Sequence, residues 1–351
     1  MSKATIRDVA REAGVSAQTV SRVLNSKDEV SPETRQKVKE VIRRLGYRPS
    51  RIARGLTTSR TGTIGLTIPS NLNLYFAEVA LGVQETAWDR GYTVIQGNST
   101  DDVERERAIL EVMESQWVDG VLCCSPRLPM DELVPLLERH PAAVVIHRSR
   151  PREDIGAVVI DDSYGISRAV NHLLEIGRKK LAFLCGAQHS YSATQRLNSF
   201  VEALEAAGLQ ADPELIVQFT SGNGPYDESA RQLSTAYAAG ENSTCALLEA
   251  HPDVDGIICF NDELAIGALR ACQQLELRVP EDVAIVGCDD TLMARLVTPP
   301  LTTLALNKYE VGAGAARMLI GKIEGRTELG EIILRHELIV RASTSRAPSS
   351  K

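Results

Sequence analysis

The sequence has few aromatic residues, no long apolar run and no paired cysteines. Aromatic residues make up 4% of the 351 residues, and the seven cysteines include no Cys-x-x-Cys pair. An odd, scattered set in apolar stretches is typical of buried thiols, not of disulfides or zinc ligands. No run is long enough to cross a bilayer, and residues 1–25 lack the apolar core of an export signal. These absences predict a cytoplasmic protein that contacts no membrane and holds no metal.

Motifs of the common enzyme classes are also absent. There is no nucleophile elbow, phosphate-binding loop or zinc-binding helix, and the six histidines are scattered. Residues 312–317 resemble the start of a dinucleotide-binding fingerprint, but they lie in a helical pattern and Arg317 occupies the third glycine position. Close helix packing explains these glycines better. His147, at the end of a predicted strand, could line a cleft or be a structural histidine. We therefore expect neither catalysis nor a cofactor.

Charge is distributed unevenly along the chain. Residues 1–60 contain 14 basic and 6 acidic side chains, whereas the rest of the chain contains 25 and 40. A basic N-terminal segment suits neutralisation of DNA phosphates, whereas an acidic body would be repelled from a duplex. The alternative is a merely solvated basic face.

The basic segment has the pattern of three short helices. Thr5 can cap a first helix that ends at Gly14, and Ser16 can cap a second. A third helix is expected from Ser31-Pro32 to Gly46. Two helices joined by a glycine turn form the smallest motif that holds one of the helices rigidly enough to enter a DNA major groove. Residues 1–49 therefore predict a helix-turn-helix DNA-binding head.

Residues 50–62 separate this head from the body. Gly55 lies inside a single short turn that could not persist alone in water. The segment is either a flexible linker or a hinge that becomes helical only when two copies meet on DNA. Propensity alone does not choose between them.

From Thr63 onward, apolar strands alternate with amphipathic helices, which predicts an α/β body of doubly wound parallel sheets. Ten strands are many for one such sheet, so we expect two lobes that divide near Asp161. The expected strands are 63–68, 93–96, 120–124, 143–147, 157–160, 181–185, 215–219, 256–260, 284–287 and 332–339. The expected helices include 76–90, 104–116, 164–176, 194–207, 263–275 and 311–324.

Polar pairs follow several strands, where open parallel sheets bind their ligands. Carboxylates and amides beside aromatic rings suit a polyhydroxylated ligand, so a sugar is the default expectation. The alternative is that each acid caps a helix, which we favour for Asp161, Asp162 and Asp262 over Asp289. The residues concerned are Asn71, Tyr75, Phe76, Asp161-Asp162, Asn261-Asp262 and Asp289-Asp290.

An ordered set of segments carries a family resemblance that covers essentially the whole chain. It comprises 5–25, the hinge 51–60 with Leu56, 119–121, 173–177, 196–200, 261–268, 279–283, 287–290 and 300–303. These segments resemble the LacI/GalR family of bacterial repressors.

The resemblance implies a homodimer that binds a near-palindromic double-stranded DNA operator and a body, like periplasmic binding proteins, that senses a small sugar-like effector. The C-terminal tail has no heptad pattern, so a dimer is expected rather than a coiled-coil tetramer. The implied parts are a head over 1–49, a hinge over 50–62, a first lobe over 63–161 plus about 291–325, a second lobe over 162–290 plus about 326–342, and a polar tail over 343–351.

The resemblance also implies roles for individual residues. Leu56 would insert into the minor groove, where an apolar side chain kinks the duplex. The implied base contacts are Ala17, Gln18, Arg22 and Leu56; the implied phosphate contacts are Thr5, Ser16, Thr19, Ser21, Asn25 and Ser31; the implied effector contacts are Tyr75, Phe76, Arg196, Asn261 and Asp289. Cys288 and Leu306 depart from the family pattern and make one wall of the pocket smaller and less polar.

Two other functions are compatible with parts of the chain. The body alone would permit a sugar-binding transport component, against which the basic head and the missing export signal argue. A nucleotide-using enzyme is possible on the same fold class, because a fold does not determine function. The sequence leaves open whether an effector induces or corepresses.

Overall fold

The structure is a computed structural model that describes residues 4–24, 29–47, 60–186, 190–218, 235–326 and 328–345. It divides into two compact units, Met1–Gly62 and Thr63–Lys351. Among the described residues, no helix is long and apolar enough to cross a membrane. All seven cysteines are free, and all but Cys245 are buried, as expected from their apolar surroundings.

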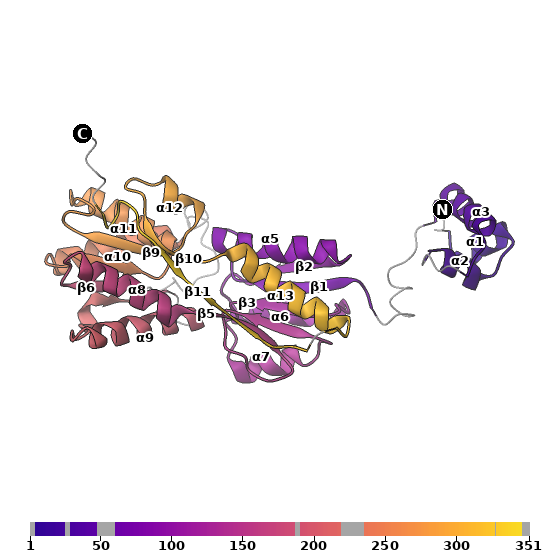
Figure 1. Cartoon of the computed structure of the whole chain (residues 1–351), viewed down its shortest axis with the longest axis horizontal. Helices are drawn as coiled ribbons and strands as arrows, with labels where there is room; N and C mark the ends of the chain where they lie inside the picture. The colour runs from indigo at the N-terminus through magenta and orange to yellow at the C-terminus, as the bar shows by residue number, and fades with distance from the viewer. Residues whose placement is uncertain are drawn as a thin grey trace. The chain divides into compact units, whose positions relative to one another are not determined.

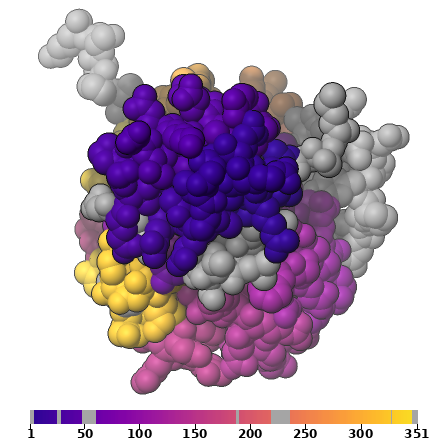
Figure 2. Space-filling view, turned by 90° about the vertical axis from the view of Figure 1, so that its right-hand side faces the viewer, coloured from indigo at the N-terminus to yellow at the C-terminus, as the bar shows by residue number. Residues whose placement is uncertain are grey.

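The described part of the N-terminal unit contains the three predicted helices, α1 (Ile6–Ala13), α2 (Ala17–Leu24) and α3 (Pro32–Leu45) (Figure 1). Figure 2 shows this unit in indigo with its side chains filled in. The predicted caps are confirmed. Thr5 and Asp8 form a reciprocal capping box, and Ser31 accepts from the Thr34 amide. Gly14 and Gly46 end α1 and α3 with positive φ of 68° and 59°, which glycine adopts without strain. The small core between the helices consists of Val9, Ala10, Ala13, Val20, Val23, Val38 and Val41.

The body contains two six-stranded sheets with strand orders β11-β5-β4-β3-β1-β2 and β12-β10-β9-β8-β6-β7. All pairings are parallel except that of β10 with β12. The first sheet and its helices are called the first lobe, and the second sheet and its helices the second lobe. The strands are β1 (Thr63–Ile68), β2 (Thr93–Asn98), β3 (Val121–Cys124), β4 (Ala143–Ile146), β5 (Gly156–Asp161), β6 (Leu181–Leu184), β7 (Ile216–Val217), β8 (Gly256–Cys259), β9 (Ala284–Asp289), β10 (Thr302–Ala305), β11 (Glu331–Arg335) and β12 (Glu337–Ile339).

Helices cover both faces of each sheet, which is why the central strands are buried throughout. In β3, Leu122 faces one core, whereas Val121 and Cys123 face the other. The first lobe has α5 (Leu74–Asp89), α6 (Val103–Ser115), α7 (Met130–Leu137) and α13 (Lys308–Ile323); the second has α8 (Asp162–Glu175), α9 (Tyr191–Ala206), α10 (Thr235–Ala250), α11 (Asp262–Gln274) and α12 (Leu292–Leu296), with a 3-10 turn at Pro213–Leu215.

Glycine allows two pairs of these helices to pack closely. In the first lobe, a side chain at Gly312 of α13 would overlap the carbonyl oxygen of Val79 on α5, and α5 and α13 lie side by side (Figure 1). In the second, a side chain at Gly267 of α11 would overlap the carbonyl oxygen of Tyr237 on α10. The 312–317 segment is thus a helix contact, as the sequence suggested.

The chain passes between the lobes at three places within the described residues: after Asp161, between β10 and α13, and at His336 between β11 and β12. Figure 1 shows β11 running along the edge of the first sheet beside β5. The expected division near Asp161 agrees with this topology.

Two of the expected lobe boundaries are wrong at the level of strands. Residues 302–305 were expected in the first lobe but form β10 of the second sheet, and residues 331–335 were expected in the second lobe but form β11 of the first. The expected single strand over 332–339 is two strands in different sheets. Continuous apolar alternation cannot show that a chain changes partners at His336, because both halves have the period of a strand.

Candidate functional sites

The helix α2 presents a short polar face to solvent. Val20 and Val23 are buried, so Ala17 and Gln18 point away from the core and are exposed. Arg22 is half-exposed, and its Nε lies 3.2 Å from a carboxylate oxygen of Glu29. This ion pair is on the surface, where such pairs contribute little and exchange readily for other anions.

Three of the hydroxyls expected on phosphates, those of Thr5, Ser16 and Ser31, act as helix caps in the structure. Ser16 Oγ accepts from the Thr19 amide at 3.0 Å, and the two side-chain oxygens lie 2.9 Å apart. Thr5 Oγ1 accepts from the Asp8 amide at 3.3 Å and Ser31 Oγ from the Thr34 amide at 3.3 Å. Each hydroxyl therefore lies at the N-terminus of a helix, where backbone amides and a partial positive charge favour anions. Asn25 and Leu56 lie outside the described residues.

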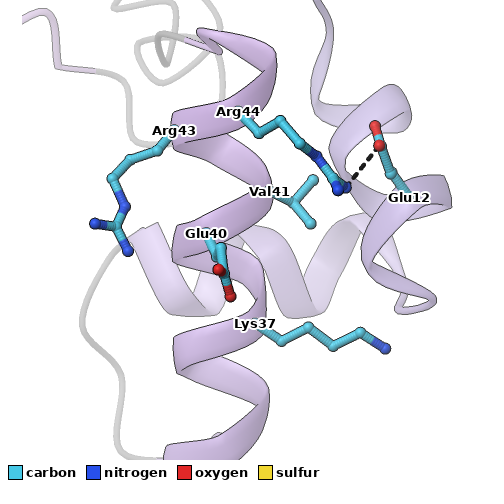
Figure 3. Close-up of a pocket in the computed structure, with 6 residues that line it drawn as sticks. All are labelled: Glu12, Lys37, Glu40, Val41, Arg43 and Arg44. Carbon is cyan, nitrogen blue, oxygen red and sulfur yellow. Dashed lines mark hydrogen bonds and ion pairs between the residues drawn. The ribbon is translucent and has the colours of Figure 1, made fainter.

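A shallow hollow on the head lies between α1 and α3 (Figure 3). Arg44 donates to Glu12 at 2.6 Å across it, and this pair joins the two helices. The hollow is lined by Glu12, Lys37, Glu40, Val41, Arg43 and Arg44. Its mixed charges do not distinguish it as an anion site.

In the body, some polar residues at the strand ends are caps and others are not. Asp161 accepts from the Tyr164 amide at 3.0 Å, and Asn261 from the Leu264 amide at 2.9 Å. The expectation that Asp162 and Asp262 are caps is wrong. Asp262 is buried, and its carboxylate instead accepts from Thr291 and Thr303 of the second lobe.

Asp162 and Arg196 form a buried ion pair in the second lobe. Arg196 Nε donates to Asp162 Oδ1 at 2.8 Å, and its Nη1 donates to the Phe260 carbonyl oxygen. The guanidinium also lies 4.8 Å from the centre of the Phe260 ring. His336 Nε2 lies 3.1 Å from the same Asp162 oxygen. Burial alone would raise the pKa of Asp162, but Arg196 and His336 outweigh it and hold that pKa well below its usual range.

Tyr75 and His147 join the first lobe to the second. The Tyr75 hydroxyl is hydrogen-bonded to His147 Nε2, and His147 Nδ1 lies 3.3 Å from Ser192 Oγ on α9. Burial lowers the pKa of His147 to about 3, so the ring is neutral at neutral pH. Phe76 packs edge-to-face on Tyr75, with ring centroids 5.4 Å apart, and borders the first-lobe core. His147 is buried and both of its ring nitrogens have partners, so it is a structural histidine that links the two lobes.

Asp289 ends β9 in an unusual conformation. Its φ is 118° and that of Asp290 is 48°, a region that residues other than glycine rarely adopt. Its carboxylate is buried, and Arg196 Nη1 lies 3.9 Å from it. Burial, only partly offset by Arg196, raises the pKa of Asp289 well above its usual value.

The structure brings Arg196 and Asp289 to within 3.9 Å of each other. Burial raises the pKa of Tyr75 well above its usual value, and Asp289 and Arg196 act on that pKa in opposite directions. Asn261 follows Phe260, whose carbonyl Arg196 holds. Ser192 contacts His147, His336 contacts Asp162 and Lys308 contacts Asp289. No pattern in the sequence indicates these three residues. The replaced positions Cys288 and Leu306 are both buried.

Comparison with known sequences covers both units. The family "Bacterial regulatory proteins, lacI family" matches residues 5–50, and the "Periplasmic binding protein-like domain" matches residues 170–344. The HTH-type transcriptional regulator RegA of Clostridium saccharobutylicum is 36% identical over 344 residues, 97% of this chain and 99% of that protein. The HTH-type transcriptional repressor CytR of Escherichia coli K12 is 31% identical over 346 residues, with coverages of 98% and 97%.

Solved structures give the same result. A lac repressor dimer bound to operator and the anti-inducer ONPF has a TM-score of 0.82 at 25% identity, covering 98% of this chain and 100% of that one. A complex of the transcriptional regulator CelR with cellobiose has a TM-score of 0.69 at 33% identity, with coverages of 97% and 99%. Fold and relatives together define a DNA-binding transcription regulator. The chain belongs to the lacI family of bacterial regulatory proteins.

Proposed function

We propose that this regulator is a repressor that binds a pseudo-palindromic operator as a homodimer in the cytoplasm, and that a sugar or sugar derivative bound between the lobes changes its DNA affinity. The observation that carries the proposal is a cationic head with an exposed helix α2, in a unit separate from a body whose polar residues meet across two lobes.

In this proposal, the exposed face of α2 reads the major groove. Arg22 exchanges its surface partner Glu29 for guanine, Gln18 pairs with adenine, and Ala17 touches a thymine methyl. Leu56 wedges into the minor groove. The phosphate contacts are Thr5, Ser16, Thr19, Ser21, Asn25 and Ser31.

The test uses a symmetric duplex that the wild-type protein selects from a random pool of sequences. The Arg22→Ala variant is then titrated against this duplex, and its affinity is compared with that of the wild type. We expect affinity to fall by about 10- to 100-fold and discrimination to relax at one base pair in each half-site. Arg44→Ala is the matched control, because Arg44 is a head arginine paired with Glu12 instead of lying on α2. Equal affinity of Arg22→Ala and wild type for the selected duplex would reject the proposed reading of DNA.

For the effector, the cluster favours a neutral molecule rich in hydroxyls. Arg196 is already bonded to Asp162 and Phe260, so it has little capacity left for a ligand anion. Asp289, in contrast, is a buried acidic side chain that lies 3.9 Å from Arg196, beyond hydrogen-bonding distance. Tyr75, Phe76 and Asn261 complete the proposed contacts. That a CelR structure contains cellobiose supports a sugar.

A thermal-shift screen with cellobiose, D-ribose, glucose 6-phosphate and adenosine tests this choice, because a compound that binds only the native state raises its melting temperature. We expect a neutral sugar to stabilise the wild type and Asp289→Asn to lose most of that shift. Stabilisation by the phosphate alone would contradict the proposed ligand class. Adding the active compound to the protein and the selected duplex then shows whether it raises or lowers the DNA affinity. An inducer weakens binding, and a corepressor strengthens it.

A further inference from the structure

Lys308 is a buried lysine whose hydrogen-bond partners belong to the other lobe. It is the first residue of α13 in the first lobe and is only 5% exposed. Its ammonium donates to the backbone carbonyl oxygens of Asp289 at 2.8 Å and of Asp290 at 2.9 Å, both in the second lobe. A carboxylate oxygen of Glu78 lies 3.6 Å away. Burying an ammonium is costly unless its hydrogen bonds are made, and two of these bonds go to one turn of backbone.

That turn is the strained end of β9. The positive φ values of Asp289 and Asp290 cost free energy and persist only where the surroundings enforce them. The Asp290 side chain is held by Arg295 at 2.6 Å and by Arg341. On the other side of the turn, Lys308 donates to both backbone carbonyl groups.

We propose that Lys308 is a positioning residue for the effector site, because its ammonium holds the strained Asp289–Asp290 backbone and so sets the direction of the Asp289 carboxylate. This inference rests on the proposed function, because it takes Asp289 to be a residue that contacts the effector. Lys308 uses its hydrogen bonds on carbonyl groups and not on the Asp289 carboxylate, which leaves that carboxylate to accept from a ligand hydroxyl. It also joins α13 of the first lobe to a ligand residue of the second.

The experiment is a double-substitution cycle on the full-length protein without ligand or DNA. Lys308→Met removes the ammonium but keeps most of the apolar stem. Asp289→Gly relieves the strain, because glycine adopts positive φ freely, whereas Asp289→Asn removes the carboxyl group and keeps the strain. We expect Lys308→Met to lower the melting temperature by about 5 °C or more in the wild type and in Asp289→Asn, and by less than half as much in Asp289→Gly.

Equal losses in the glycine and asparagine backgrounds would overturn the proposal and leave Lys308 as an ordinary buried ion. If Lys308→Met does not fold, the comparison of Asp289→Gly with Asp289→Asn still decides: relief of strain requires the glycine variant to melt higher, and an equal or lower value rejects it.

Hydrogen exchange provides a second readout that general destabilisation would not mimic. In Lys308→Met, we expect the amides of residues 287–292 to exchange at least about tenfold faster while the rest of the body is unchanged. Glu78→Gln is the matched control, because it removes the 3.6 Å contact and leaves both carbonyl bonds in place. Uniformly faster exchange would reject the proposal. Neither readout uses ligand or DNA, so failure of the repressor proposal and failure of this one are distinguishable.

Discussion

At the scale of single residues, the buried His147 makes stability depend on pH. Its pKa is about 3 in the folded protein because of burial, below the ordinary value of 6.5. The unfolded chain therefore binds the proton first as pH falls, so stability present above pH 6.5 is lost progressively down to about pH 3. One such proton contributes a slope of up to about 1.4 kcal/mol per pH unit.

We expect His147→Gln to flatten this acid loss, measured as the free energy of unfolding in urea between pH 7 and pH 4.5. His251→Gln is the control, since His251 lies near the surface beside Glu214 and outside the cluster. An unchanged slope in His147→Gln would mean that the Asp162 carboxylate keeps the buried ring charged, against the opposing effect of Arg196 and His336 on its pKa.

Single residues also show what sequence reasoning could reach. The caps at Thr5, Ser16 and Ser31 were predictable, because a cap and its amide lie three residues apart. The partners of His147 were not, because Tyr75 lies 72 positions away in the chain and Ser192 lies 45 away. No local pattern records such a contact. Tyr75, Phe76, Asn261 and Asp289 were predicted from their positions after strands, whereas Arg196 followed only from the family resemblance.

At the scale of elements, the contact of α5 with α13 gives a matched pair of glycine substitutions. Gly312→Ala would overlap the Val79 carbonyl, whereas an added carbon at Gly314 has no neighbour closer than 3.6 Å. We expect Gly312→Ala to destabilise the body by about 1–3 kcal/mol through overpacking. Gly314→Ala should stabilise it by up to about 1 kcal/mol, because alanine favours the helix.

Thermal unfolding of both variants measures the difference. If Gly314→Ala proves the more damaging of the two, the close crossing does not exist as described.

The sequence predicted some helices and strands better than others. The strand over 63–68 was predicted to the residue, because Ile64, Leu66 and Ile68 alternate with small or polar residues before a polar turn. The helices α7, α10 and α12 and the strand β10 were not predicted. Pro135 lies inside α7, Gly240 inside α10, and α12 is only five residues long, so each lacks the long regular period on which such predictions depend.

At the scale of the whole molecule, one exposed apolar stripe supports the proposed homodimer. Leu74, Leu81 and Trp88 recur every seven residues along one face of α5 and are 39%, 47% and 78% exposed. Exposed apolar stripes of this kind mark protein contacts.

We expect Leu81→Glu to shift the protein toward monomer in sedimentation experiments and to weaken binding to a two-half-site duplex. Ile333→Glu is the control, because Ile333 is a similarly exposed apolar residue on β11, away from α5. A wild-type protein that sediments as a monomer at micromolar concentration would contradict the dimer itself.

The three chain passages between the lobes limit which segments of this regulator can be exchanged with those of a relative. Two strands of the second sheet, β10 and β12, come from late in the sequence. The second lobe is therefore not a single continuous segment of the chain. A chimaera that transplants residues 162–290 alone would pair foreign strands with native ones at β9–β10. Sensory specificity should therefore transfer between relatives only when 162–305 and 337–345 are exchanged together, with the cuts made at the passages themselves.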